Sequence, residues 1–546
     1  MGKSGYQLRR QILIWALLIT TLGVTPFYSY DPINIFRATT VLIFGLISAG
    51  ALVINFKSLL SKENRTVLFL SVLFLLWAAL ASINSNMEIA ETLFGVTGRN
   101  TGLLTYSSLL FLMLLAVIKR NSTSIPNLVL VLLSCGLISA LYGLIQSFGF
   151  DPFDWINPYS PVFGFFGNPN FQASFMGISA TAALSYCLQK SKWNIWRNIW
   201  LSYIPISLYV VYASKSQQGY LVFAAGASVV IYLWIKSFSS LSRLKPLYFF
   251  LGFIGVTSVL LDILQKSPWQ SVLYKPSVTF RGDFWRTGWN ITQGNPIFGV
   301  GLDGYRDSYR LYRDQIAAER NPSAMVDSAH NVFLDISSGG GFPLLIIYSG
   351  LILLVLISIF RVARREKEFN YSFAGIAGAW VAYLAQSVIS INQIGLAIWG
   401  WILSGVIIGY EIRTKKVTPS VTVNNKSLEP VVISLGLIIG LVVSLPLILT
   451  DGQFRSTVKA GDVIKIEQNL ERWPQSVIRM NLAAQIFIDG GFANRALTIS
   501  QKAVKLNPRN FEAWEKVYLN PESNENTKAQ ALAKMRELDP LNPNIK

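Results

Sequence analysis

The sequence is divided into blocks of about twenty apolar residues, and this division constrains the fold more than any other feature. A helical block of that length crosses the ~30 Å hydrocarbon core of a bilayer at 1.5 Å per residue. Open segments can satisfy their own backbone hydrogen bonds in lipid only as helices. We therefore predict an all-α polytopic membrane protein with about thirteen spans. The predicted spans are Ile12 to Tyr28, Val67 to Ile83, Leu128 to Gln146, Leu247 to Leu264, Leu344 to Phe360 and Val431 to Leu449, and others starting near Ile35, Gly102, Phe171, Ile199, Gly219, Phe373 and Ile394.

The net charge of +18 is unevenly placed along the chain. Basic residues gather in every second loop between spans, as in the run Arg361, Arg364 and Arg365, whereas the intervening loops hold few. This alternation follows the positive-inside rule. It predicts a protein of the inner (cytoplasmic) membrane with its N-terminus in the cytoplasm and everything after Leu449 outside. The same placement argues against nucleic acid as a partner.

The tail after the last span is soluble in composition and contains a repeat. Pro474, Pro508 and Pro540 recur at close to the 34-residue period of tetratricopeptide repeats. We therefore predict two domains, a membrane domain over 1–450 and an exterior helical domain over 451–546 that resembles these repeats. Such solenoids usually offer a binding surface, which suggests a protein partner. The alternative is a plain helical hairpin that only packs on the membrane domain.

A long exterior loop, residues 265–341, is predicted between the ninth and tenth spans. Loops of this length are uncommon unless they are functional or disordered, and this one is rich in arginines and aromatic residues. Within it, Gly304 to Glu319 is predicted to be one helix. Arg306, Arg310 and Arg313 would then share a face.

Two residues of this loop are candidates for chemistry. His330 is the single histidine of the chain, and imidazole takes up a proton near neutral pH. Arg281 opens the segment Arg281-Gly-Asp-Phe-Trp285, and arginine can hold diphosphate oxygens through two parallel hydrogen bonds. The plainer readings are an interfacial histidine with satisfied hydrogen bonds, and an interfacial helix whose arginines touch lipid headgroups.

Three shorter exterior loops carry polar groups as well. One contains Arg99 between glycines, another contains Asn168 and Asn170, and a third holds the cation Lys215 in a very short turn. Glycine and asparagine also serve tight turns at the end of a span, which is the structural explanation for these residues.

Three short sequence motifs occur in order along the chain. They are Gly167-Asn168-Pro169-Asn170, Arg281-x-x-x-Trp285 followed by Phe298-Gly-Val-Gly301, and Ala329-His330-Asn331 followed by a glycine-rich step. Together, over about residues 90 to 410, they resemble the O-antigen ligase and polymerase superfamily, which includes bacterial protein O-oligosaccharyltransferases.

The resemblance implies a membrane glycosyltransferase that moves a glycan from a polyprenyl-diphosphate carrier to a glycan, lipid or protein acceptor at the outer face of the membrane. It implies His330 as general base and Arg281 as diphosphate ligand. The superfamily often has a second arginine as Ser-Arg-Gly after span seven, where this chain has Ser216-Gln217-Gln218-Gly219. No metal or cofactor is expected, because the lipid diphosphate is already activated. The predicted substrate-binding residues are Lys215, Arg286, Arg306, Arg99, Asn168 and Asn170.

A transporter or flippase for a small anion or a lipid-linked glycan is the alternative from another class. Transporters often place polar or broken helices near the bilayer midplane in two repeated halves. The sequence has no cluster of charges within a span and no two-half symmetry, and its chemistry-bearing residues lie in exterior loops. This distribution favours an enzyme.

Overall fold

The computed structural model of the chain describes residues 3–118, 124–155, 160, 162–238, single positions between 243 and 257, 276–415 and 428–545. Most of the predicted span Leu247 to Leu264 and the start of the long loop, residues 265–275, lie outside this description.

Within the described ranges the chain is helical and contains no strand, and eight of its helices are long and apolar enough to cross a membrane. The all-α polytopic membrane class is therefore confirmed. The eight are α2 (Asn34–Ile54), α4 (Arg65–Ile83, extended to Lys62), α7 (Ser124–Ser147), α10 (Gln218–Lys236), α16 (Val332–Arg365), α17 (Tyr371–Ile389), α18 (Ile394–Thr414) and α19 (Glu429–Ala460).

Four further helices cover the remaining predicted spans within the described chain, so the total number of crossings stays a prediction. The first predicted span was too long, because its helix ends at Leu22, ahead of Gly23 and Pro26. Proline disfavours helical geometry in the residue before it, which ends the helix early. The four are α1 (Lys3–Leu22), α6 (Leu103–Ile118), α8 (Pro169–Cys187) and α9 (Ile195–Ala213).

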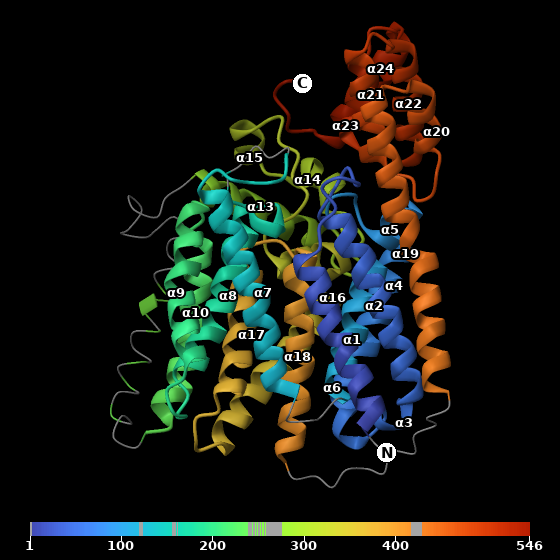
Figure 1. Cartoon of the computed structure of the whole chain (residues 1–546). Helices are drawn as coiled ribbons and strands as arrows, with labels where there is room; N and C mark the ends of the chain where they lie inside the picture. The colour runs from blue at the N-terminus through green and yellow to red at the C-terminus, as the bar shows by residue number, and fades with distance from the viewer. Residues whose placement is uncertain are drawn as a thin grey trace.

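The helices form one bundle with α18 at its centre (Figure 1). Every residue of α18 from Ile394 to Ile412 is buried, as expected for a helix that is apolar on all sides. By contrast α19 exposes Val431, Ile438 and Val442. In a membrane protein this apolar surface faces lipid.

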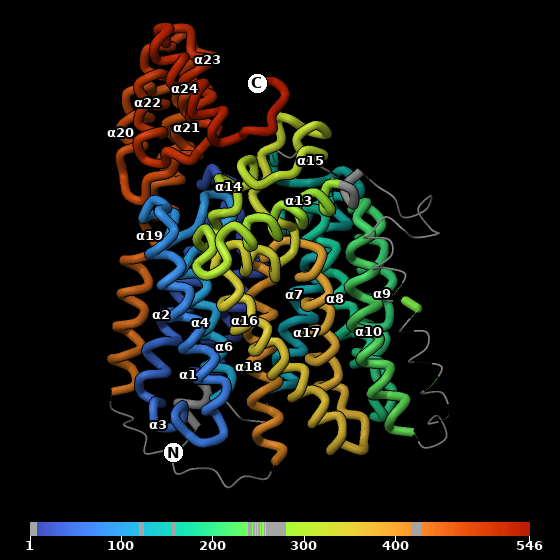
Figure 2. The backbone as a smooth tube through the Cα atoms, turned by 180° about the vertical axis from the view of Figure 1, so that it is seen from behind, coloured from blue at the N-terminus to red at the C-terminus, as the bar shows by residue number. Residues whose placement is uncertain are grey.

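Short helices gather at one end of the bundle, beside the C-terminal helices, and the N-terminus lies at the other end (Figures 1 and 2). The tail and the N-terminus therefore lie at opposite ends. The short helices at the tail's end are α5 (Ile89–Phe94), η2 (Gly164–Phe166), α13 (Pro276–Gly294), α14 (Tyr305–Tyr312) and α15 (Gln315–Arg320), while α3 (Phe56–Leu59) and η1 (Lys62–Asn64) connect α2 to α4.

The single helix predicted over Gly304 to Glu319 is wrong, because two helices occupy this stretch. Arg313 adopts an extended backbone, and the carboxylate of Asp314 caps α15 by accepting a hydrogen bond from the Ala317 amide at 2.8 Å. An aspartate N-cap starts a new helix rather than continuing the old one.

The tail continues directly from α19 and folds as five helices. Consecutive helices from α20 to α24 pack on one another around a core that includes Phe487, Ala503 and Ala531. The helical prediction for the tail is confirmed, and its assignment to tetratricopeptide repeats stays a prediction. The helices are α20 (Val463–Leu470), α21 (Val477–Asp489), α22 (Ala493–Leu506), α23 (Phe511–Leu519) and α24 (Glu525–Leu538).

Candidate functional site

His330 lies in the short connection that leads into α16, and its backbone is held in an unusual conformation. Its φ is +52°, a region that non-glycine residues seldom adopt and that recurs at functional sites. Its amide donates to Oγ of Ser328 at 2.8 Å, and that hydroxyl donates to Asp335 at 3.1 Å. Asn331 then caps α16 by accepting from the amides of Phe333 and Leu334. The start of α16 therefore fixes His330.

Asp335 also links His330 to Arg99, on the loop between α5 and α6. Nη2 of Arg99 lies 3.7 Å from Asp335, and Nε lies 3.0 Å from Asp303. Its Nη1 donates to the backbone oxygen of Asp327 at 3.0 Å. The guanidinium is buried, and three carboxylates surround it. Arg99 thus holds the loops that carry His330 together, and its charge is already neutralised within the protein.

Helix α13 brings three side chains toward His330 from one face. The ring of Phe284 lies 5.3 Å from the imidazole, and Nε1 of Trp285 lies 3.5 Å from the His330 carbonyl oxygen. Arg281 precedes them by about one turn, so its side chain projects from the same face. The structure therefore brings the two predicted catalytic residues together, although they are far apart in the sequence.

Arg281 differs from the other candidate arginines in its partners. Its Nη2 donates to Oε1 of Gln218 at 3.2 Å, and within the described residues it forms no ion pair. Burial lowers the pKa of Arg281, yet a guanidinium stays charged at any working pH. It is therefore a half-buried cation with no carboxylate of the described chain within ion-pair distance.

Arg286 and Arg306 have carboxylate partners instead. Arg286 pairs with Asp283 and Asp314, each at 2.6 Å. Arg306 pairs at 2.9 Å with Glu512 of the C-terminal domain. Their predicted role in substrate binding stays a prediction, and a substrate there would have to displace these pairs.

The start of α8 and the turn that leads into α10 meet beside Arg281. Oδ1 of Asn170 accepts from the hydroxyl of Ser216 at 2.7 Å, and Nε2 of Gln218 donates to Ser174 on α8 at 2.8 Å. Lys215 is exposed in the same turn, with a φ of +57°. Gln218 stands directly before Gly219, where the Ser-Arg-Gly pattern has its arginine, and here it contacts Arg281.

Electrostatics keep His330 neutral. Burial lowers its pKa, Asp327 raises it in part, and Arg281 and Arg99 lower it, which leaves the pKa at about 4. A neutral imidazole is the form that can accept a proton. The site therefore pairs a proton acceptor with a nearby uncompensated cation.

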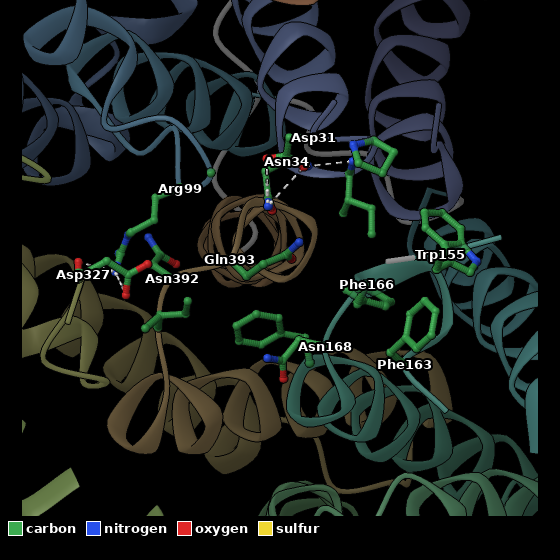
Figure 3. Close-up of a pocket in the computed structure, with 16 residues that line it drawn as sticks. Asp31, Asn34, Arg99, Trp155, Phe163, Phe166, Asn168, Asp327, Asn392 and Gln393 are labelled. Carbon is green, nitrogen blue, oxygen red and sulfur yellow. Dashed lines mark hydrogen bonds and ion pairs between the residues drawn. The ribbon is translucent and has the colours of Figure 1, made fainter. Parts of the chain in front are cut away.

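A cavity of about 280 Å³ opens next to this site. Arg99 and Asp327 line one side of it, and Asn168 lies on another (Figure 3). Of the predicted substrate-binding residues, the structure places Arg99 and Asn168 on the cavity. Arg281 and His330 are not among the residues that line it.

Several residues of this region were missed at the level of sequence. Asp303, Asp327 and Asp335 surround Arg99, and Gln218 binds Arg281, but each is an ordinary loop or helix-end residue in sequence. Gln393, in the connection before α18, also lines the cavity. A polar residue in so short a connection between two apolar helices was the one available signal for Gln393.

Within the described ranges no group of three or more histidine, cysteine, aspartate or glutamate residues is arranged to hold a metal ion. The expectation of chemistry without metal or cofactor stays a prediction.

The fold defines an integral membrane protein with a polar site at one end of a helical bundle. Residues 202–349 match the family model described as O-antigen ligase, and this stretch contains Arg281, His330 and the Ser216–Gly219 turn. The match confirms the superfamily that the sequence motifs resemble. A search of curated proteins gave no match.

Proposed function

We propose that this protein transfers a glycan from a polyprenyl-diphosphate carrier to an acceptor hydroxyl at the outer face of the cytoplasmic membrane. The opposite placement of the N-terminus and the C-terminal domain supports this orientation together with the basic loops. The acceptor is a glycan, a lipid or a protein, and the C-terminal helices offer a surface for a protein partner.

This proposal rests on the surroundings of Arg281. Its guanidinium contacts Gln218 and forms no ion pair among the described residues. A half-buried cation is costly unless an anion compensates it. The other candidate arginines, Arg99, Arg286 and Arg306, already have carboxylate partners. A diphosphate group is the anion that the proposed donor would bring to Arg281.

The reaction requires one bond to form and one to break. The acceptor oxygen attacks the anomeric carbon of the lipid-linked sugar, and the bond from that carbon to the diphosphate oxygen breaks. The acceptor proton passes to the neutral imidazole of His330, and the electron pair leaves with the diphosphate, whose growing charge Arg281 stabilises. The fixed loops hold both groups in place, which supplies proximity.

The test is glycan transfer by the purified full-length protein from a polyprenyl-diphosphate-linked glycan, with and without EDTA. We expect His330→Ala to lower the rate by about 10²–10⁴-fold, the usual contribution of a general base. Gln315→Ala, an exposed substitution on α15, is the matched control and should transfer at the wild-type rate. A His330→Ala protein with wild-type activity would refute the proposed mechanism, and loss of activity in EDTA would refute its independence from metal.

A further inference from the structure

The cavity beside the site is formed by five segments that are distant in sequence. They are the connection before α2, the loop that carries Arg99, the stretch that holds Trp155, Phe163 and Phe171, the segment before α16 that carries Asp327, and the short connection between α17 and α18. Figure 3 shows Gln393 in the middle of the view, between Arg99 and Asp327 on one side and Trp155, Phe163 and Phe166 on the other.

Gln393 is the unusual residue in this cavity. Its side chain is only 5% exposed, and neither Oε1 nor Nε2 has a hydrogen-bond partner within the described residues. Buried amides are nearly always paired, so an amide with two unused groups on a cavity wall indicates a polar ligand. Its neighbour Asn392 shows the contrast, because its amide bonds both Tyr106 and Tyr383 at 3.2 Å.

A buried arginine lies behind Gln393. The side chain of Arg37 is fully buried and donates to the backbone oxygens of Thr21 and Phe165 at 2.9 Å, while its Nε and Nη1 have no partner in the described part of the chain. A Cβ on Gly395 would lie 2.8 Å from Nη1 of Arg37 and 3.0 Å from Oε1 of Gln393, so the two groups are neighbours. A hydrogen bond between them would still leave Nε2 of Gln393 for a ligand.

The opposite wall is aromatic. Trp155 and Phe163 meet edge to face with ring centroids 5.6 Å apart, and Phe166 stacks under the guanidinium of Arg37 at 4.6 Å. The indole nitrogen of Trp155 is already used, since it donates to Tyr142 at 2.8 Å. A ligand would therefore contact ring faces on this wall rather than hydrogen-bonding groups. Apolar walls with a few polar groups are typical of ligand pockets.

The cavity has no excess of positive charge, because carboxylates outnumber cations around it in the described chain. Arg99 lies 4.0 Å from Asp327 and is neutralised further by Asp303 and Asp335. Asp31 accepts from the amides of Ile33 and Asn34. An uncharged ligand fits this wall better than a diphosphate, and the volume is close to the lower end of the ~300–1,000 Å³ range of ligand pockets.

A sugar ring combines these requirements, because it has hydroxyl groups at its edge and apolar C–H faces. We propose that this cavity binds one sugar unit of the glycan, with Gln393 hydrogen-bonded to its hydroxyl groups and Trp155 packed on its face. Arg99 and Asp327 line the cavity and also act on the charge of His330, so the sugar would lie beside the proton acceptor. The inference rests on the proposed function, and the sugar belongs either to the donor or to the acceptor.

The experiment uses the full-length protein in detergent micelles and saturation-transfer NMR with glucose, galactose and N-acetylglucosamine as probes. We expect at least one sugar to give a signal with the wild type. Gln393→Leu keeps the volume but removes the amide, so this signal should fall by about 3- to 10-fold, the loss of one or two hydrogen bonds. Gln501→Leu, an exposed glutamine on α22, is the matched control and should leave it unchanged.

A second variant and a folding measurement distinguish loss of the sugar site from loss of the fold. Trp155→Leu should weaken the same signal without touching Gln393, and thermal unfolding of both variants would show whether they are folded. An unchanged signal in folded Gln393→Leu would overturn the proposal, as would a wild type that binds none of the sugars, which would mean a cavity filled by water only.

Kinetic measurements distinguish a donor sugar from an acceptor sugar in the cavity. They also test the sugar site separately from the proposed mechanism of transfer. Gln393→Leu should raise the KM for the lipid-linked donor alone if the donor sugar occupies the cavity, and the KM for the acceptor alone if the acceptor does. His330→Ala should lose transfer but keep sugar binding. If sugar binding requires Gln393 but transfer does not require His330, only the proposed mechanism is refuted. If transfer requires His330 but sugar binding does not require Gln393, only the sugar site is refuted.

Discussion

Arg313 and Asp539 form a fully buried ion pair that joins the segment between α14 and α15 to the C-terminal helices. Nη2 of Arg313 lies 2.8 Å from each carboxylate oxygen, and both side chains have no exposed surface. Arg310 adds a contact of its own to the same carboxylate at 2.7 Å. Arg306 meets Glu512 nearby. Arg306 and Arg310 lie on α14 and Arg313 follows its end, so the three arginines do not share one helix face as predicted, but all three contact the tail.

Asp539→Ala should detach the tail from the segment that carries Arg310 and Arg313. It leaves two buried guanidinium groups without their anion, and breaking a buried pair in this way costs roughly 3–5 kcal/mol. We expect a lower thermal midpoint and faster proteolysis in α14 and α24. Glu537→Ala removes an exposed partner of Lys534 on the same helix and is the control, with a change near zero. Equal stability of the two variants would show that the pair does not hold the tail.

The pH dependence of transfer should reflect the low pKa of His330. With a pKa of about 4, the imidazole is neutral at neutral pH and becomes protonated only as the pH falls through about 4. The pH dependence of kcat/KM reports the free enzyme. Its decrease on the acid side should therefore lie near pH 4, with a plateau at higher pH. A decrease near 6.5 would contradict the buried environment of His330.

The lowered pKa of His330 also predicts how the stability of the folded protein depends on pH. An unfolded histidine binds a proton below about pH 6.5, whereas folded His330 does so only below about 4. The unfolded state therefore binds more protons in this window, and the wild type should lose stability as the pH falls from 6.5 to 4. His330→Gln should lose less over the same window in thermal unfolding, and parallel curves for the two proteins would argue against the shift.

Arg281 should tolerate even a conservative change poorly. Arg281→Lys keeps a charge but loses the planar fork that suits a diphosphate, so activity should fall clearly. Arg281→Ala should fall further, by about 10²-fold, as when one electrostatic group of an active site is removed. Lys215→Ala, in the exposed turn beside it, should have a smaller effect. The reverse order, measured in the same transfer assay, would move the phosphate contact to that turn.

The kink in α16 should depend on Gly341. Its φ is +71°, and a Cβ there would lie 2.2 Å from the backbone oxygen of Ile297. Gly149 has a similar φ of +78° but open space around it. Gly149→Ala should cost only the left-handed backbone strain of about 1–2 kcal/mol, and Gly341→Ala should cost more because the loop must move. Similar thermal midpoints for the two variants would show that the close approach does not matter.

The positions of the spans could be read from the sequence because a long apolar block needs no information about its neighbours. Only lipid or a bundle core can accept such a block, and helices α2, α17 and α18 begin within a few residues of the predicted positions. Boundaries set by local backbone chemistry were less certain. The cap at Asp314 broke one predicted helix in two, and Pro26 shortened the first span.

His330 and Arg281 could be singled out from the sequence, because a lone histidine and an Arg-x-x-x-Trp segment in a long polar loop are local patterns. The roles of their neighbours depended on tertiary structure. The sequence predicts Arg99 to bind substrate, but only the fold shows the carboxylates around it, and Gln218 and Gln393 are ordinary polar residues in sequence. A charge is available to a substrate only if no partner neutralises it, and those partners lie on segments that are brought together only when the bundle folds.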